Sequence, residues 1–282
     1  MSQSVGPLRA LASSGRRALR HAWWRVGRAH PAPLFVLGNQ KAGTTVVAAL
    51  VAARLGESVV IDPLYEIGDW SVENDLFSGR RTVRSLVRTH RRFFRAAVIK
   101  DPSYTFFQRE LATVFPRARF AMVLRDPRDN IRSILNRLQL PGTVGSVRDA
   151  EIQAALGRFG NGGWRTVLEG TNPSTEAATV IESLALRWEA ALDVYRAAPE
   201  QVEILRYETF REDKAAEIDG LLTRLGRSGS RDITSQVDRQ FQKKGDNSST
   251  WEGFFGLENL RTIEAVCARG MAEMDYPRTM ID

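Results

Sequence analysis

The sequence predicts an α/β fold: a single domain with a central, mostly parallel sheet of about five strands, flanked by helices on both faces. Short apolar runs alternate with segments of helical periodicity after Pro33, and each run lacks a polar face, which is typical of strands covered on both sides. The 282 residues are 43% hydrophobic and 26% charged, which suits a globular chain with a sizeable core. The single cysteine, Cys267, excludes an internal disulfide and a cysteine-built zinc site.

The elements follow from these patterns in order. Apolar runs predict strands at 34–38, 59–61, 97–100, 119–124 and 202–205. Apolar residues at helical spacing predict helices near 44–55, 106–114, 127–138, 148–156 and 175–197, and the chain after residue 205 is predicted to be mostly helical. Glycine, proline and polar residues predict loops at 141–145, 160–163 and 243–250. We expect the active edge of the sheet to be the one formed by the carboxyl ends of its strands.

Residues 1–33 are predicted to be a basic N-terminal extension to a domain spanning 34–282. Eight basic residues precede the first acidic residue, Glu57, whereas the rest of the chain carries 32 basic and 33 acidic residues. The excess charge therefore belongs to the N-terminal fifth, and nucleic acid is not an expected partner. The arginines interleave with leucines, Trp23 and Trp24. A solvated tail or a packed first helix is the favoured interpretation, and contact with an anionic membrane surface is the alternative.

A glycine loop follows the first predicted strand and opens the first predicted helix. Gly38 and Gly43 have the glycine spacing of a nucleotide triphosphate loop, and Thr45 holds its hydroxyl position. The position of the usual lysine is occupied by Thr44, and the only lysine is Lys41, inside the loop. Such a loop can bind an oxyanion through backbone N–H groups and the helix N-terminus. It lacks the lysine through which kinases and ATPases contact the terminal phosphates.

A second motif ends the fourth predicted strand. In Arg125-Asp126-Pro127-Arg128-Asp129, Asp126 can cap the following helix and Asp129 can close a capping box. Arg125 then lies at the carboxyl end of the strand, and Ser133 lies two turns into the helix. Both can reach one anion, whereas Arg128 is interpreted as either a further anion contact or surface charge.

Together these motifs resemble the sulfotransferases that use 3′-phosphoadenosine 5′-phosphosulfate (PAPS), a family with a P-loop-like domain. The resemblance rests on Gln40-Lys-Ala-Gly-Thr-Thr45 and on the Arg125 motif, followed by the weaker matches Arg206-Tyr-Glu208 and Lys243-Lys-Gly245. It implies transfer of a sulfuryl group from PAPS to a hydroxyl or amine by in-line displacement, without a required metal. The residues it implies for the nucleotide are Lys41, Ala42, Gly43, Thr44, Thr45, Arg125, Ser133, Lys244 and Gly245.

The resemblance also implies two further catalytic residues. Lys100 matches the lysine of a Lys-Ser/Thr-Pro segment found in carbohydrate-modifying members, although Pro102 stands where other members have a catalytic histidine. Those members use a glutamate as general base, and Glu66 is the preferred candidate because it follows the second predicted strand. The further candidates are Asp62, Asp101 and His90.

The expected acceptor is a small molecule, a glycan or a lipid, and the expected location is the cytoplasm or the inner face of a membrane. Two other functions stay open on sequence grounds. One is a P-loop small-molecule kinase, which the threonine at position 44 disfavours. The other is a non-catalytic nucleotide-binding protein, which the missing histidine at Pro102 keeps open. Sequence patterns do not indicate the oligomeric state.

Overall fold

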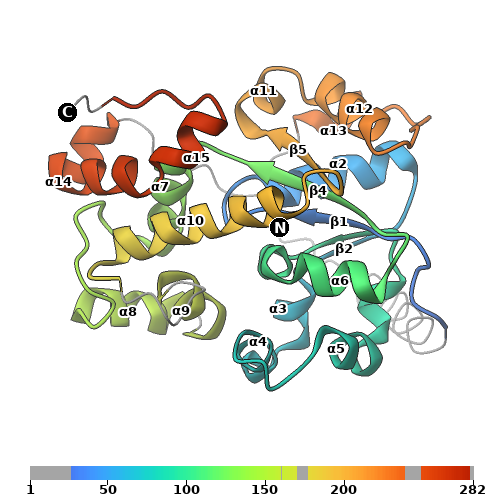
Figure 1. The fold of residues 1–282 in the computed structure, drawn as a ribbon, viewed down its shortest axis with the longest axis horizontal. Helices are drawn as coiled ribbons and strands as arrows, with labels where there is room; N and C mark the ends of the chain where they lie inside the picture. Colours follow the sequence, from blue (N-terminus) through green and yellow to red (C-terminus); the bar gives the residue numbers. More distant parts are fainter. Residues whose placement is uncertain (1–26, 160, 170–176, 239–248, 280–282) are drawn as a thin grey trace, which may run out of the picture.

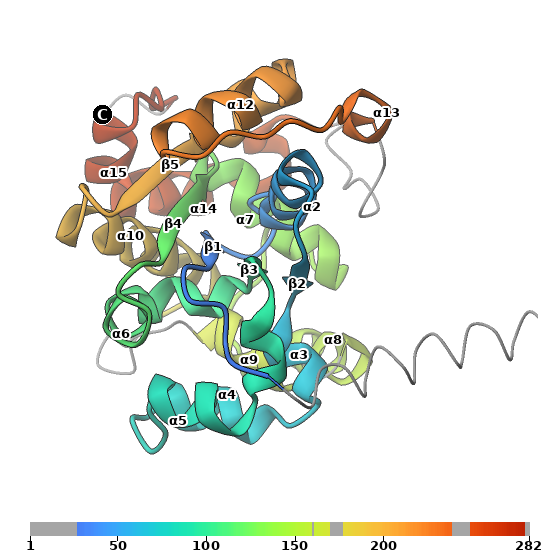
Figure 2. The ribbon, with the colours of Figure 1, turned by 90° about the vertical axis from the view of Figure 1, so that its right-hand side faces the viewer.

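A computed structural model describes residues 27–159, 161–169, 177–238 and 249–279. Its sheet has five parallel strands in the order β2-β3-β1-β4-β5, all labelled in Figure 2, and Figure 1 shows the sheet among its helices. The strands are β1 (Leu34–Leu37), β2 (Val59–Ile61), β3 (Val98–Lys100), β4 (Arg119–Leu124) and β5 (Val202–Arg206). The predicted α/β fold with a central parallel sheet is therefore confirmed.

Helices connect the strands. Those from β1 to β4 are α2 (Thr44–Leu55), α3 (Pro63–Ile67), α4 (Trp70–Phe77), α5 (Val83–Thr89), the 3₁₀ turns η1 (Arg91–Arg95) and η2 (Pro102–Phe107), and α6 (Gln108–Val114). Those between β4 and β5 are α7 (Pro127–Leu138), α8 (Ala150–Phe159), α9 (Asn161–Glu169) and α10 (Val180–Ala197). After β5 come α11 (Tyr207–Glu212), α12 (Lys214–Arg224), α13 (Thr234–Val237), α14 (Trp251–Val266) and α15 (Ala268–Glu273).

The alternation of side chains along β1 explains why the strand is apolar on both faces. Leu34 and Val36 pack with α2 and α12, whereas Phe35 and Leu37 pack with the helices of the opposite layer. All four side chains are completely buried. Figure 2 shows α2 and α12 on one side of the sheet and α4, α5 and α6 on the other. A parallel sheet covered on both faces requires this continuous hydrophobic pattern.

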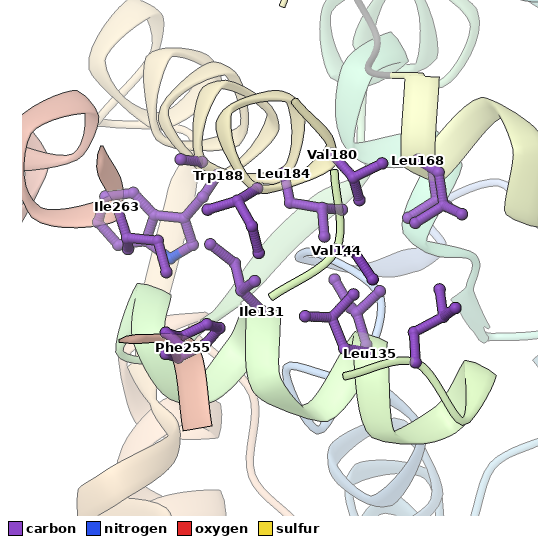
Figure 3. Close-up of a cluster of buried hydrophobic side chains, with 14 of the residues drawn as sticks. Ile131, Leu135, Val144, Leu168, Val180, Leu184, Trp188, Phe255 and Ile263 are labelled. Carbon is purple, nitrogen blue, oxygen red and sulfur yellow. The ribbon is translucent and has the colours of Figure 1, made fainter. Parts of the chain in front are cut away.

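A third group of buried side chains packs α7, α8, α9, α10 and α14 together (Figure 3). The group includes Trp188 of α10, Ile131 of α7 and Ile263 of α14. This packing fixes α7 and α10 beside the carboxyl ends of β1 and β4, where both motifs from the sequence lie.

Three local predictions differ from the structure. The stretch at 62–96, to which no element was assigned, contains three short helices, α3, α4 and α5. The glycine-rich stretch at 160–163, which was predicted to be a loop, contributes Asn161 to Gly163 to helix α9. Helices this short are marginal on their own and form because neighbouring elements pack on them. The long helix predicted from 175 begins at Val180, where the Thr179 side chain accepts a hydrogen bond from Glu182 N.

The N-terminal extension lies mostly outside the described residues, because the description begins at residue 27. Within the described ranges, no helix has the length and apolar character needed to cross a bilayer.

Candidate active site

The glycine loop lies where the sequence predicts it, between β1 and α2 at the carboxyl edge of the sheet. Two of its positions require glycine. Gly38 has a φ of 129°, and a Cβ there would lie 2.4 Å from Val123 O of the neighbouring strand β4. Gly43 has a φ of 102°, and a Cβ there would lie 2.5 Å from the Tyr207 ring. Both positive φ values and both close approaches exclude a side chain.

The loop is held in place from several elements. The Gly38 N–H donates to Thr105 Oγ1 at 2.8 Å, and that hydroxyl donates to Gly38 O at 3.2 Å. Asn130 Nδ2 of α7 donates to Gln40 O at 2.8 Å, and Arg187 Nη2 of α10 donates to Gln40 Oε1 at 3.0 Å. The first turn of α2 has no side-chain cap, so its N–H groups and its positive dipole end point toward the loop. This is the arrangement that binds a phosphate-type anion.

Lys41 lies within this loop and lines a cavity of about 770 Å³. Its backbone adopts a positive φ of 66°. Burial, together with the positive charges of Arg137, Arg125 and Lys100, lowers the pKa of its ammonium group from 10.5 to about 8. An anion bound beside Lys41 would relieve this unfavourable electrostatic environment, so the site is electrostatically prepared for a negatively charged ligand.

Arg125 lies at the end of β4, as predicted, and reaches the same loop. Its Nη1 donates to Lys41 O at 3.1 Å, and its guanidinium stacks over the Tyr207 ring at 4.8 Å from the centroid. The Arg125 carbonyl accepts a hydrogen bond from Trp188 Nε1 at 2.9 Å. Arg125 and Ser133 of α7 both line the cavity that contains Lys41. The two predicted anion-binding motifs therefore meet in one cavity.

The other charged residues of this motif have structural roles that differ in part from the prediction. Asp126 caps α7, since its Oδ1 accepts from Arg128 N at 2.9 Å. The predicted capping box with Asp129 is wrong, because the Asp126 N–H donates to Glu208 Oε1 at 2.9 Å instead. Arg128 is neither a cavity residue nor surface charge: it is fully buried and pairs with Asp126 and Glu264, each at 2.6 Å. These buried pairs fix the backbone that carries Arg125.

Lys100 is the last residue of β3 and lines the same cavity as Arg125. Its Nζ forms an ion pair of 2.7 Å with Asp62 Oδ1. The Lys100 side chain is 5% exposed, whereas the Asp62 side chain is 38% exposed. Asp62 has a left-handed backbone (φ 51°, ψ 56°) and precedes α3, yet its side chain caps no N–H group of that helix. The turn after β2 therefore directs this carboxylate to Lys100 and the cavity.

The structure separates the four candidates for the general base. Glu66 is exposed on α3 and is not among the residues that line the cavity, so the geometry does not support the candidate preferred from the sequence. Asp101 lines the cavity but is buried and accepts hydrogen bonds from Leu64 N and Ser103 N. Burial and the neighbouring carboxylates raise its pKa to about 8. His90 lies between α5 and η1 and does not line the cavity. Asp62 alone of the four is both partly exposed and part of the cavity wall.

Three residues of the site were not predicted. Glu73 of α4 lines the cavity and accepts a hydrogen bond from Ser103 Oγ, and burial raises its pKa. Arg187 is buried in α10, bonds to Gln40 and stacks on Phe106 at 4.5 Å. Tyr207 supports both Gly43 and Arg125. Tyr207 belongs to the Arg206-Tyr-Glu208 match, although no site role was assigned to it. Arg187 also left a signal in the sequence, because an arginine interrupts the apolar stripe of a long helix there.

Lys244 and Gly245 lie outside the described residues, so their predicted role stays a prediction. In the described parts of the chain, no group of three or more histidine, cysteine, aspartate and glutamate side chains is arranged to hold a metal ion.

Comparisons with known proteins agree with this fold. A model of the Sulfotransferase family matches residues 65–230, more than half of the chain. The structure of sulfotransferase STF9 from Mycobacterium avium matches with a TM-score of 0.54 at 13% identity, covering 93% of this chain and 83% of that one. Mouse sulfotransferase SULT7A1 complexed with PAP matches with a TM-score of 0.50 at 10% identity, covering 88% and 87%. Curated protein sequences gave no match.

A parallel sheet that carries a glycine loop and a large cavity at its carboxyl edge defines the α/β class of this protein. The chain belongs to the sulfotransferase family, and it is an enzyme of sulfuryl transfer. Members of this family typically use PAPS as the sulfuryl donor. The family match begins at Tyr65 and does not include the loop at 38–45. The function proposed for this loop therefore depends on the residues and geometry of the loop itself.

Proposed function

We propose that this sulfotransferase transfers the sulfuryl group of PAPS to a hydroxyl or amine of a carbohydrate, a lipid or a small metabolite. One observation carries the proposal: a single cavity is lined by the glycine loop, by Arg125 with Ser133, and by the Lys100–Asp62 pair. PAPS has two anionic ends, and the cavity offers two separate cationic groups for them. The volume of about 770 Å³ lies in the range of small-ligand pockets.

The loop suits the 5′-phosphosulfate. Residues 41–45 would surround it with backbone N–H groups, the hydroxyls of Thr44 and Thr45, and the Lys41 ammonium group. Arg125 and Ser133 would hold the 3′-phosphate, since both line the same cavity at the adjacent strand end. The hydrogen bond from Arg125 to Lys41 O ties these two binding positions together.

The reaction requires positioning and charge stabilisation. The acceptor oxygen forms a bond to sulfur while the bond from sulfur to the bridging oxygen breaks, and adenosine 3′,5′-bisphosphate leaves with the electron pair. Negative charge grows on the bridging and phosphate oxygens as that bond breaks. Lys41, half-buried in the loop, would stabilise this charge, which is a preorganised electrostatic contribution. The proton of the acceptor hydroxyl passes to a general base.

We assign the general base to Asp62. Its carboxylate is partly exposed in the cavity wall, so a substrate hydroxyl can approach it. Lys100, whose Nζ lies 2.7 Å from Asp62 Oδ1, orients the carboxylate in the cavity wall. Asp101 lacks this access, because its two oxygens are already used by backbone N–H groups.

The base assignment has a matched test. Asp62→Asn is expected to lower kcat by about a hundredfold or more, because positioned bases contribute 10²- to 10⁴-fold, while the KM for PAPS stays within about twofold. Glu66→Gln, on the same turn of chain but outside the cavity, is expected to retain nearly full kcat. Steady-state kinetics on both variants test the assignment of the base. A large loss of kcat in Glu66→Gln, or full kcat in Asp62→Asn, contradicts the assignment.

The acceptor end of the cavity combines apolar and polar walls. Tyr65 is 66% exposed and meets Trp70 edge-on at 5.8 Å between ring centroids. Trp164 of α9 contributes a further aromatic wall. Flat aromatic surfaces beside carboxylates suit an acceptor that has both a carbon-rich face and hydroxyl groups, such as a sugar ring or a lipid headgroup.

The function is tested by incubating the full chain with ³⁵S-labelled PAPS and separate sugars, lipids, phenols and amines. We expect label to appear on at least one acceptor class with adenosine 3′,5′-bisphosphate as the co-product. Binding of adenosine 3′,5′-bisphosphate without transfer to any class would favour a non-catalytic nucleotide-binding protein. Magnesium-dependent turnover of ATP in place of PAPS would favour a kinase and contradict the proposal.

A further inference from the structure

Three of the carboxylates that line the cavity lie together at one end of it. Asp62 and Asp101 follow β2 and β3, at one side of the sheet, and Glu73 comes from α4. Asp101 interacts electrostatically with both of the others. Lys41 and Arg125, proposed to bind the donor, follow the neighbouring strands β1 and β4. The three carboxylates therefore lie at the end of the cavity that is left for the acceptor.

Glu73 is the member of this group with an unused oxygen. It is 4% exposed, and its Oε1 accepts a hydrogen bond from Ser103 Oγ. Within the described residues nothing donates to its Oε2, and it forms no ion pair, although the charge of Arg187 is near. Asp62 and Asp101, by contrast, already have a lysine and two backbone N–H groups as partners. A buried carboxylate in this position gains from a cationic ligand.

Aromatic rings lie beside this carboxylate. Trp70 is one helical turn before Glu73 on α4, and its ring meets that of Tyr65 at 5.8 Å between centroids. Helix α9 lies next to α4 (Figure 2), and a Cβ on its Gly163 would lie 2.9 Å from the Trp70 ring and 3.2 Å from Glu73 Oε2. Trp164 follows and also lines the cavity. Rings beside a carboxylate suit an ammonium group, because the face of an aromatic ring attracts cations.

We propose that the acceptor carries an ammonium group beside its reacting hydroxyl, and that the ammonium binds Glu73 Oε2 against the rings of Tyr65 and Trp70. The inference rests on the proposed function, because the hydroxyl of the same molecule must reach Asp62. An anionic donor in the same cavity acts in the same direction, since it attracts a cation and repels an anion. A hydroxyl in place of the ammonium would leave Glu73 without a cation and gain less from the rings. The substrate class is therefore amino sugars and amino alcohols.

Matched pairs of ligands test the ammonium site. Tyramine and tyrosol differ only by an ammonium in place of a hydroxyl, and so do glucosamine and glucose. We expect calorimetry on the full chain at neutral pH, with and without adenosine 3′,5′-bisphosphate, to give at least about tenfold tighter binding of the ammonium member in at least one pair. In Glu73→Gln, whose amide oxygen can still accept from Ser103, the preference should fall to within about threefold. A lack of preference in both pairs contradicts the proposal, as does a preference that Glu73→Gln retains.

Two further variants complete the test. Asp75→Asn removes the same charge from the same helix, but Asp75 pairs with Arg80 and does not line the cavity, so the preference should stay within about twofold of wild type. Tyr65→Leu changes an exposed ring and tests the site even if Glu73→Gln does not fold. It should weaken binding of the ammonium member by about threefold and change binding of the neutral member little. An equal loss for both members contradicts the proposal.

Labelled PAPS separates this inference from the proposed function. If label reaches the two members of each pair with equal kcat/KM, sulfuryl transfer stands and the ammonium site is contradicted. If the binding preference depends on Glu73 but no acceptor is labelled, the ammonium site is supported and the proposed function is contradicted. We expect label on the hydroxyl of an ammonium-bearing acceptor, with a kcat/KM at least about tenfold above that of its neutral counterpart.

Discussion

Replacing Lys41 by alanine is expected to lower kcat for sulfuryl transfer by about a thousandfold, the upper range for loss of one group that stabilises transition-state charge. The reason is geometric: Lys41 lies inside the loop proposed to hold the phosphosulfate and lines the cavity. Affinity for adenosine 3′,5′-bisphosphate should fall less than kcat, because the backbone N–H groups of the loop remain. Single-turnover kinetics with labelled PAPS measure the effect, and retention of more than about a tenth of wild-type kcat contradicts it.

The same residue predicts a pH dependence. Burial and the nearby cations lower the pKa of Lys41 to about 8, so the ammonium form that the mechanism requires is lost as the pH rises through this value. The kcat/KM for PAPS, which reports the free enzyme, should therefore fall above about pH 8. In Lys41→Arg the guanidinium stays charged throughout this range, so any activity that remains should lack this decline.

Replacing Arg125 by alanine is expected to weaken binding of adenosine 3′,5′-bisphosphate by about a hundredfold, since hydrogen bonds to charged groups contribute about 1.5–3 kcal/mol. The Arg125 guanidinium is held by the Tyr207 ring and by its hydrogen bond to Lys41 O, so little of its binding strength is lost in ordering the side chain. Arg119→Ala, at the exposed opposite end of the same strand, is the matched control and should bind normally. Isothermal titration calorimetry measures both affinities.

The sheet and the positions of the two motifs proposed to bind anions could be predicted from sequence for a physical reason. Strands buried on both faces must be continuous apolar runs, and Gly38 and Gly43 mark places where the backbone has a positive φ and a close neighbour. Arg125 could be placed because a proline and a capping aspartate locate the start of the following helix. These signals come from residues close together in the sequence, so they can be recognised before the fold is known.

The features that were missed depend on contacts between distant parts of the chain. The capping box at Asp129 is replaced by Glu208, which is 82 residues away from Asp126 in sequence. Arg187 supports Gln40 across 147 residues. The choice between Asp62 and Glu66 depends on the left-handed backbone conformation at Asp62, which turns the Asp62 carboxylate toward the cavity. The two residues are only four positions apart after a short strand, and sequence spacing alone does not show which of them faces the cavity.

The central claim is that a single nucleotide contacts both the loop at Lys41 and the end of β4 at Arg125. Its most direct test compares the affinities of wild type and Arg125→Ala for adenosine 3′,5′-bisphosphate and for adenosine 5′-phosphate. A nucleotide that spans both positions predicts a loss of about a hundredfold with the bisphosphate and a change within about threefold with the monophosphate. Equal losses for the two ligands, or equal affinity of the wild-type protein for both, would show that Arg125 does not bind the 3′-phosphate.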